Sequence, residues 1–209
     1  MATTTTNYGF DIPQSTDLVK DGATAIATLG QDIDTAMNTA LGTKKAGMVL
    51  LNTTSFSGVS SQSINSVFNS TYDNYFIMYK NTTSSGSPVL TLKLRAAGVD
   101  TSTNYGSQRI YSQGAGVFGE RDGVGTDELY VADLANTGQA INATQLYVYS
   151  PNLAAATTFS ATNVMLLSTT LYSTANVGFQ NSSTQFDGFT LIVSTGTFGG
   201  TVSIFGVAK

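Results

Sequence analysis

The sequence predicts a mainly β protein in which an extended N-terminal arm and one helix precede an antiparallel β-sandwich of the jelly-roll type. Thr and Ser, which favour strands and turns, account for 32 and 22 of the 209 residues. Only one segment, residues 15–42, has apolar residues at convincing helical spacing. From residue 48 onward, short alternating runs are separated by turn signals roughly every ten residues, which is typical of sandwiches.

Residues 1–14 are expected to form an extended attachment arm. Tyr8, Phe10 and Ile12 alternate with a period of two, which suits a segment that lies across another surface. Pro13 disfavours helix in the residue before it. The alternative is an unattached tail with incidental aromatic residues. Because a free arm would leave its apolar groups in water, we expect Tyr8, Phe10, Ile12 and Pro13 to dock on a partner.

Residues 15–42 predict a helix for oligomerisation or anchoring. Its apolar positions follow a 3-4-3-4 heptad seam formed by Ile26, Leu29, Ile33, Ala36 and Ala40. A helix with internal glycine and several threonines has poor intrinsic propensity and needs a partner. That partner is either the chain's own β-domain or other copies of the helix. The position of the helix next to an arm, and not between strands, favours self-association.

Residues 43–47 predict a linker, and residues 48–209 a β-sandwich head. Alternating Leu90, Leu92 and Leu94 give the clearest half-buried strand. Strands are expected at 74–80, 89–97, 109–112, 129–134, 145–149, 163–168, 186–194 and 201–207. Turn residues predict a loop over Gly114–Gly125.

The composition excludes several classes of function. The chain has no His and no Cys, so it lacks a Ser-His-Asp triad, a thiolate nucleophile and the usual zinc ligands. The net charge is −4 and the nine basic residues are scattered, which argues against nucleic acid as a partner. No apolar run reaches the length of a membrane span, and the first residues do not resemble a secretion signal. We therefore expect no cofactor, no metal and no enzymatic activity.

Local motifs do not change this expectation. Residues 114–119 match GxGxxG, but a turn sequence follows where a dinucleotide site needs a helix. Glu120, Asp122, Asp127 and Glu128 form an acidic cluster whose spacing fits no complete calcium loop, and a solvated loop is the simpler interpretation. Asp133 and Asp187 are the acids nearest to apolar strands, and both also fit strand-end turns.

Ten tyrosines are the most suggestive polar aromatic feature, because tyrosine beside Ser, Asn and Gly is typical of adaptable binding surfaces. Most of them are explained as strand residues at the edge of the core, with the ring packed and the hydroxyl exposed to solvent. Tyr105, in the expected loop 100–108, is retained as the candidate ligand contact.

Two stretches resemble virion proteins of tailed bacteriophages. Residues 7–13 (NYGFDIP), 16–23 (TDLVKDGA) and 26–30 (IATLG) resemble an N-terminal module of such proteins. In the head, residues 68–79, 92–95 (LKLR), 104–105 (NY) and 202–207 (VSIFGV) resemble a phage fibre domain. The chain departs from that domain at 94–100, where LRAAGVD stands in place of LRFNGD, and at Phe205, where the family has Tyr.

The resemblance implies a structural virion protein, anchored by residues 1–41 to other virion proteins and displaying its head on the particle. Fibres of this kind are similar to homotrimers, and a heptad seam suits a trimer. We expect a short trimeric tail-fibre-like protein whose head contacts host-surface glycans. A capsid decoration protein, which stabilises or coats the phage head, is the alternative, favoured by the absence of a long shaft. A glycan-cleaving spike enzyme is a remote third.

Overall fold

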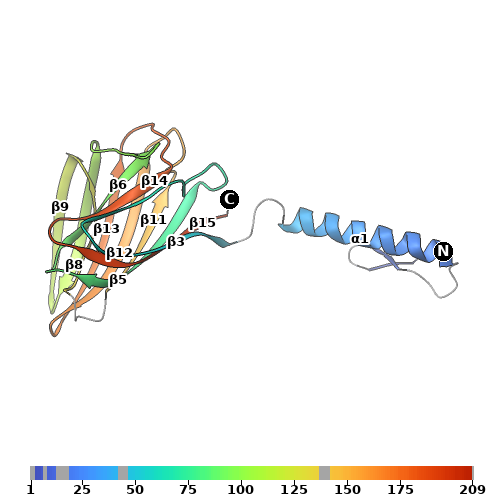
Figure 1. Ribbon diagram of the computed structural model, residues 1–209, viewed down its shortest axis with the longest axis horizontal. Coiled ribbons are helices and arrows are strands. Elements are labelled where there is room, and N and C mark those ends of the chain that lie inside the picture. Colours follow the sequence, from blue (N-terminus) through green and yellow to red (C-terminus); the bar gives the residue numbers. More distant parts are fainter. Residues whose placement is uncertain (1–2, 7–8, 13–18, 42–46, 137–141, 209) are drawn as a thin grey trace. The chain divides into compact units, whose positions relative to one another are not determined.

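The computed structural model describes residues 3–6, 9–12, 19–41, 47–136 and 142–208. The chain forms two compact units, an N-terminal unit of residues 1–46 and a β unit of residues 47–209. The N-terminal unit contains a hairpin and a helix, and every further strand lies in the β unit (Figure 1). The predicted fold class, mainly β with one helix and an antiparallel sandwich, is confirmed.

The described part of the arm folds back on itself. Strand β1 (Thr3–Thr4) pairs antiparallel with β2 (Asp11–Ile12). Between them the Thr5 amide donates to the Phe10 carbonyl at 2.9 Å, and the Thr5 hydroxyl accepts from the Phe10 amide at 2.9 Å. The hairpin satisfies backbone groups that an extended arm would leave to a partner or to water. The expectation of an arm extended over its whole length is therefore wrong.

Helix α1 (Val19–Leu41) is the predicted helix, and its flanking residues 13–18 and 42–46 lie outside the described residues. Strand β2 contacts the helix, so α1 has one partner within its own unit. Half-buried residues recur along one helix face at Gly22, Ala25, Leu29, Asp32 and Ala36. Their 3-4 spacing is the period of a helix face that packs against something else.

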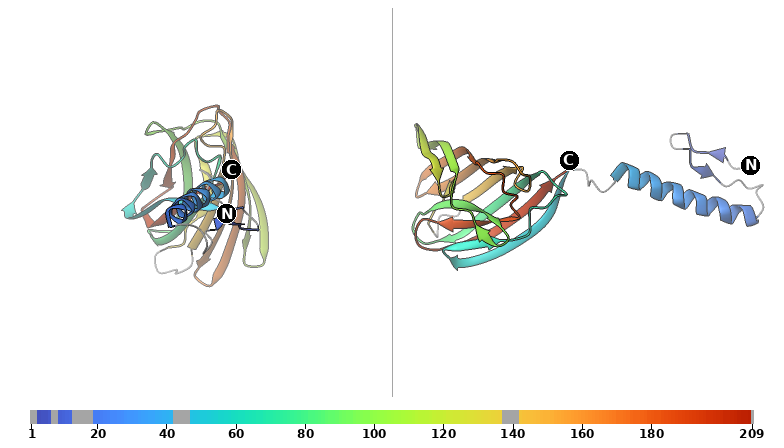
Figure 2. Two further views of the ribbon diagram at one scale, coloured as in Figure 1. Left: turned by 90° about the vertical axis from the view of Figure 1, so that its right-hand side faces the viewer. Right: turned by 90° about the horizontal axis from the view of Figure 1, so that it is seen from above.

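The β unit is a sandwich of two antiparallel sheets (Figures 1 and 2). The eight-stranded sheet has, in spatial order, β3 (Met48–Val59), β15 (Phe198–Val207), β5 (Asn74–Ser84), β11 (Asn142–Tyr149), β12 (Thr157–Leu167), β13 (Thr170–Gln180), β8 (Tyr105–Gln113) and β9 (Gly116–Thr126). The five-stranded sheet has β10 (Leu129–Asp133), β6 (Val89–Ala96), β14 (Gly188–Val193) and β4 (Ser61–Ile64), with the short β7 (Val99–Asp100) beside β6. The chain passes repeatedly between the two sheets, as expected for a jelly-roll-like sandwich.

The core lies between the sheets and is apolar. Leu90, Leu92 and Leu94 of β6 are fully buried, which confirms the predicted inward face of this strand. They belong to one cluster with aromatic side chains such as Phe189 and Tyr75. Burial of this apolar surface is the main contribution to the stability of the unit.

The loop predicted over Gly114–Gly125 is wrong, because most of it is strand β9 at the edge of the larger sheet. An edge strand needs only one neighbour, so it tolerates glycine better than a central strand does. The pairing of β9 with β8 shifts register near Gly123, which has a φ of +92°. Glycine is the residue that adopts this left-handed conformation without strain, and bulges commonly use it.

Candidate binding surfaces

The structure describes two of the four predicted attachment residues. Phe10 is half-buried and Ile12 exposes 38% of its surface. Tyr8 and Pro13 lie outside the described residues. The docking of this segment on a partner remains a prediction.

The predicted heptad seam is divided between two neighbouring faces of α1. Leu29 and Ala36 are half-buried, whereas Ala40 is exposed. A helix stripe of exposed apolar side chains is formed by Val19, Ile26, Ile33 and Met37. Ile26 exposes 63% and Met37 55% of its surface. Water-exposed apolar groups at intervals of seven and four are the pattern by which helices associate. Within the described chain no helix is long and apolar enough to cross a membrane.

Tyr105 is a core residue and not a ligand contact. Its side chain is fully buried at the start of β8, and its hydroxyl accepts from the Leu94 amide at 2.7 Å. The same hydroxyl donates to the Thr101 carbonyl at 3.2 Å. The ring therefore joins the two sheets, and the expectation of a ligand at Tyr105 is wrong.

Burial changes the titration of four tyrosines in this core. It raises the pKa of Tyr75, Tyr79, Tyr105 and Tyr130 above the usual value, because the phenolate would lose its hydration. At Tyr130 the nearby Asp133 raises the pKa further, and Arg109 opposes it. The Arg109 guanidinium lies 3.9 Å from the centroid of the Tyr130 ring. These hydroxyls stay protonated at neutral pH and act in structure.

Two members of the acidic cluster form separate ion pairs, and the side chain of Asp122 lies outside the described ones. Glu120 pairs with Arg109 at 2.5 Å, and Asp127 pairs with Lys93 at 3.2 Å. Of the side chains that the structure describes, no three His, Cys, Asp or Glu residues form a group suited to a metal ion. The GxGxxG segment leads into β9 and not into a helix, so it lacks the setting of a dinucleotide site.

The outer face of the eight-stranded sheet, turned away from the core, carries two rows of side chains that cross its strands. The register places Asn74, Tyr149, Thr158, Phe179, Gly106 and Val124 in the first row. It places Leu50, Phe205, Phe76, Tyr147, Ser160, Val177, Gln108 and Arg121 in the second. The second row is aromatic over β5 and β11, whereas the first has an asparagine over β5 and a tyrosine over β11. Both rows have a small hydroxylated residue over β12 and are mixed beyond it.

One half of this face is an aromatic patch around Phe76. The ring of Phe76 lies 4.8 Å from that of Tyr147 and 6.1 Å from that of Phe205, measured between centroids. Tyr147 in turn stacks on Tyr149 with an interplanar angle of 15°. Phe76 itself is buried, whereas Tyr147, Tyr149 and the neighbouring Leu50 are exposed. Exposed patches that combine aromatic and aliphatic residues are typical of contact surfaces.

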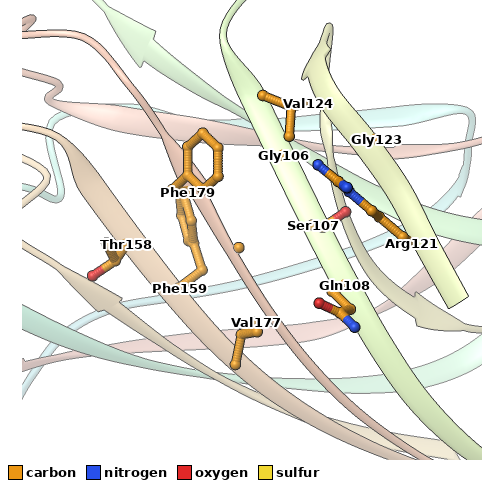
Figure 3. A pocket seen from close by; sticks show the side chains of 11 residues that line it. Gly106, Ser107, Gln108, Arg121, Gly123, Val124, Thr158, Phe159, Val177 and Phe179 are labelled. Carbon is orange, nitrogen blue, oxygen red and sulfur yellow. The ribbon is translucent and has the colours of Figure 1, made fainter. Parts of the chain in front are cut away.

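The other half contains an open hollow of about 590 Å³, shown in Figure 3. This volume lies within the usual range for small-molecule sites. Phe179 and Thr158 stand on one side of the hollow, and Arg121 and Gln108 on the other. Val177 also lines it. The hollow therefore combines an aromatic ring, a guanidinium group, an amide and a hydroxyl.

Sequence reasoning missed this hollow. Arg121 was assigned to a turn, because the strand β9 that carries it was not predicted. Phe179 lies in β13, another strand for which the pattern gave no prediction. The alternation of polar and apolar residues does not report which strands are neighbours, so no local signal could have joined β9 to β13 through β8.

No known family model matches the sequence, and no curated protein matches it. Among solved structures, the chain is similar to β-fructofuranosidase from Schwanniomyces occidentalis, complexed with fructosyl-erythritol, with a TM-score of 0.24 and 12% sequence identity. The similarity covers 78% of this chain and 34% of the other, so the chain spans about a third of that protein's length. At this TM-score the likeness carries no argument about fold or function.

Proposed function

We propose that the chain is a structural protein of a tailed-bacteriophage virion, short, trimeric and tail-fibre-like. Residues 1–41 anchor it to other virion proteins, and the β unit is its displayed head, which contacts glycans of the host surface. Two observations carry the proposal together: the helix stripe on α1, and a separate β unit that closes its own core.

The helix stripe supports self-association. Ile26 and Ile33 are seven residues apart and both exposed, so packing copies of α1 around a common axis buries both at once. Each fully buried side chain of this kind contributes about 1.5 to 3 kcal/mol relative to an exposed one. Helices of identical chains meet with identical stripes, which makes a closed symmetric oligomer the natural outcome.

We assign the head no catalytic role. Its better-placed carboxylates serve as partners of cations, as Asp100 does for Arg95 at 2.5 Å. Glycoside hydrolysis needs one acid in an apolar pocket and a second carboxylate at a set distance. Of the two acids considered from the sequence, Asp133 faces Arg109, and Asp187 accepts from the Ala97 amide.

A decoration protein of the phage capsid is the second candidate. The described chain has a single helix of 23 residues, about 35 Å in length, which gives little reach toward a receptor. The same anchoring and the same head serve either role.

Immunogold electron microscopy of virions from the encoding phage, with an antibody against the β unit, tests the proposal. Label on the tail or neck supports the fibre, and label distributed over the capsid supports decoration in its place. Virions that contain no copy of the chain would overturn both. The mass of the purified full chain by light scattering tests the trimer independently.

A further inference from the structure

We propose that the hollow on the outer face of the eight-stranded sheet binds an acidic saccharide, through stacking on Phe179 and a carboxylate held by Arg121. This site specifies the class of glycan in the proposed contact with the host surface. It rests on the proposed function only for the origin of the ligand on the host. The binding itself follows from the geometry and chemistry of the hollow.

The position of the Phe179 ring requires a glycine on the neighbouring strand. Phe179 and Gly106 are direct partners between β13 and β8. A Cβ at Gly106 would lie 2.8 Å from Cζ of Phe179, closer than side chains approach. The missing side chain lets the ring lie over Gly106 beside the hollow, with one part of its surface toward the open space (Figure 3).

Arg121 is the charged group of the hollow. Arg95 and Arg109 each form ion pairs with carboxylates at 2.5 Å. Arg121 forms no ion pair or hydrogen bond with any side chain that the structure describes, and it is exposed. No described carboxylate lines the hollow. A guanidinium group binds a planar carboxylate through two parallel hydrogen bonds, so the free cation favours an anionic ligand.

The remaining groups favour a sugar over other anions. The ring of Phe179 offers an apolar face to the C–H face of a pyranose, and Val177 extends that surface. The Gln108 amide and the Thr158 hydroxyl donate and accept hydrogen bonds, as sugar hydroxyls require. Nucleic acid and anionic membranes need several clustered cations, whereas the described lining of the hollow has one.

The hollow continues into the aromatic patch along the first row. Thr158 lies between Phe179 and Tyr149, its partners on the two neighbouring strands. Adjacent strands are about 4.8 Å apart, so the two aromatic rings flank a small hydroxylated position over about 10 Å. A chain of sugar units lying across the strands meets a ring, a hydroxyl and a second ring in turn.

Binding of oligosaccharides to the purified full chain tests the site. We expect tetragalacturonate to bind and the neutral cellotetraose to bind at least about tenfold more weakly, since a charge-assisted hydrogen bond is lost. Arg121→Gln is expected to weaken binding of tetragalacturonate by about tenfold to a hundredfold. Lys80→Gln is the matched control, because it removes one exposed positive charge from the same sheet face outside the hollow. It should leave the affinity within about twofold at moderate salt.

Phe179→Leu separates stacking from charge, and we expect it to weaken both saccharides by a similar factor. Equal loss in the Arg121→Gln and Lys80→Gln variants would overturn the site, since it would indicate attraction by overall charge. The absence of binding to tetragalacturonate and to an array of other acidic saccharides would also overturn it. None of these outcomes bears on the location of the chain in virions, so the proposed function fails or holds separately.

Discussion

The two units of this chain satisfy their apolar residues in different ways. The β unit buries Leu92, Phe189 and their neighbours completely between its own sheets. The described part of the N-terminal unit has one helix and a hairpin of two short strands, each of two residues, and it leaves Ile26 and Ile33 exposed to water. The comparison teaches that the β unit buries its apolar residues within one copy of the chain, whereas the N-terminal unit leaves exposed the apolar side chains on which the proposed association depends.

Removal of residues 1–14 has the largest expected effect on function. We expect the shortened chain to keep a folded β unit and to be lost from virions, because the predicted docking residues are gone. Cosedimentation with virions assembled in its presence, followed by blotting, measures incorporation. Incorporation at the level of the full chain would show that the arm does not dock. The helix would then be the one remaining candidate in the N-terminal unit for contact with partners.

Substitution of the helix stripe tests the dependence on partners directly. We expect Ile26→Asp combined with Ile33→Asp to dissociate the oligomer, because each carboxylate would lose its hydration at the helix contact. Thr28→Asp combined with Thr35→Asp is the matched control, which adds the same charge on exposed positions of the opposite helix face. Light scattering of the full chain gives the mass. An unchanged mass for the stripe variant would assign these isoleucines to another contact.

A substitution that leaves a cavity in the core of the β unit should lower its stability without changing the association of the chains. We expect Phe189→Ala to lower the free energy of unfolding by about 3 to 5 kcal/mol, because the fully buried ring leaves a void. Leu171→Ala, at an exposed position of β13, should change it by less than about 0.5 kcal/mol. Urea unfolding followed by circular dichroism measures both. Similar losses in the two variants would contradict the assigned core.

High pH should destabilise the β unit through its buried tyrosines. Their folded-state pKa values lie above that of an exposed tyrosine, so the folded chain retains protons that the unfolded chain releases above about pH 10. Their contribution is fully present below that pH and is lost as the pH rises, by up to about 1.4 kcal/mol per pH unit for each tyrosine. Urea midpoints across this range measure the slope. Tyr79→Phe should reduce it, and an equal slope in the variant would contradict the assignment.

The smallest expected effect is the difference in stability between variants of two arginines on neighbouring strands. Arg109→Gln should lower the free energy of unfolding by about 1 to 2 kcal/mol, because its partner Glu120 is half-exposed but its contact with the Tyr130 ring is buried. Arg121→Gln should change it by less than about 0.5 kcal/mol, since this side chain is exposed and unpaired among the described residues. Thermal unfolding of the two variants gives the difference. A comparable loss at Arg121 would show that it supports the fold.

Much of the architecture could be predicted from local patterns, because alternation and helical spacing reflect burial directly. The leucines of β6 and the helical spacing of α1 are examples. Strand β13 was missed because its inward face carries Thr174, Asn176 and Gln180, so burial and polarity do not alternate together. Strand β9 was missed because its glycines indicated turns. The hollow depends on the order β12-β13-β8-β9, which long-range pairing sets.

The place of β15 in the sheet also constrains how the protein is made. This strand follows every other strand in the sequence, yet it pairs with β3 on one side and β5 on the other. Until the ribosome has released β15, the earlier strands β3 and β5 each keep an unpaired edge and the core stays open. Such distant pairing is slow to form, and the waiting chain is prone to aggregate. Chains cut short before β15 therefore fail to close the sandwich.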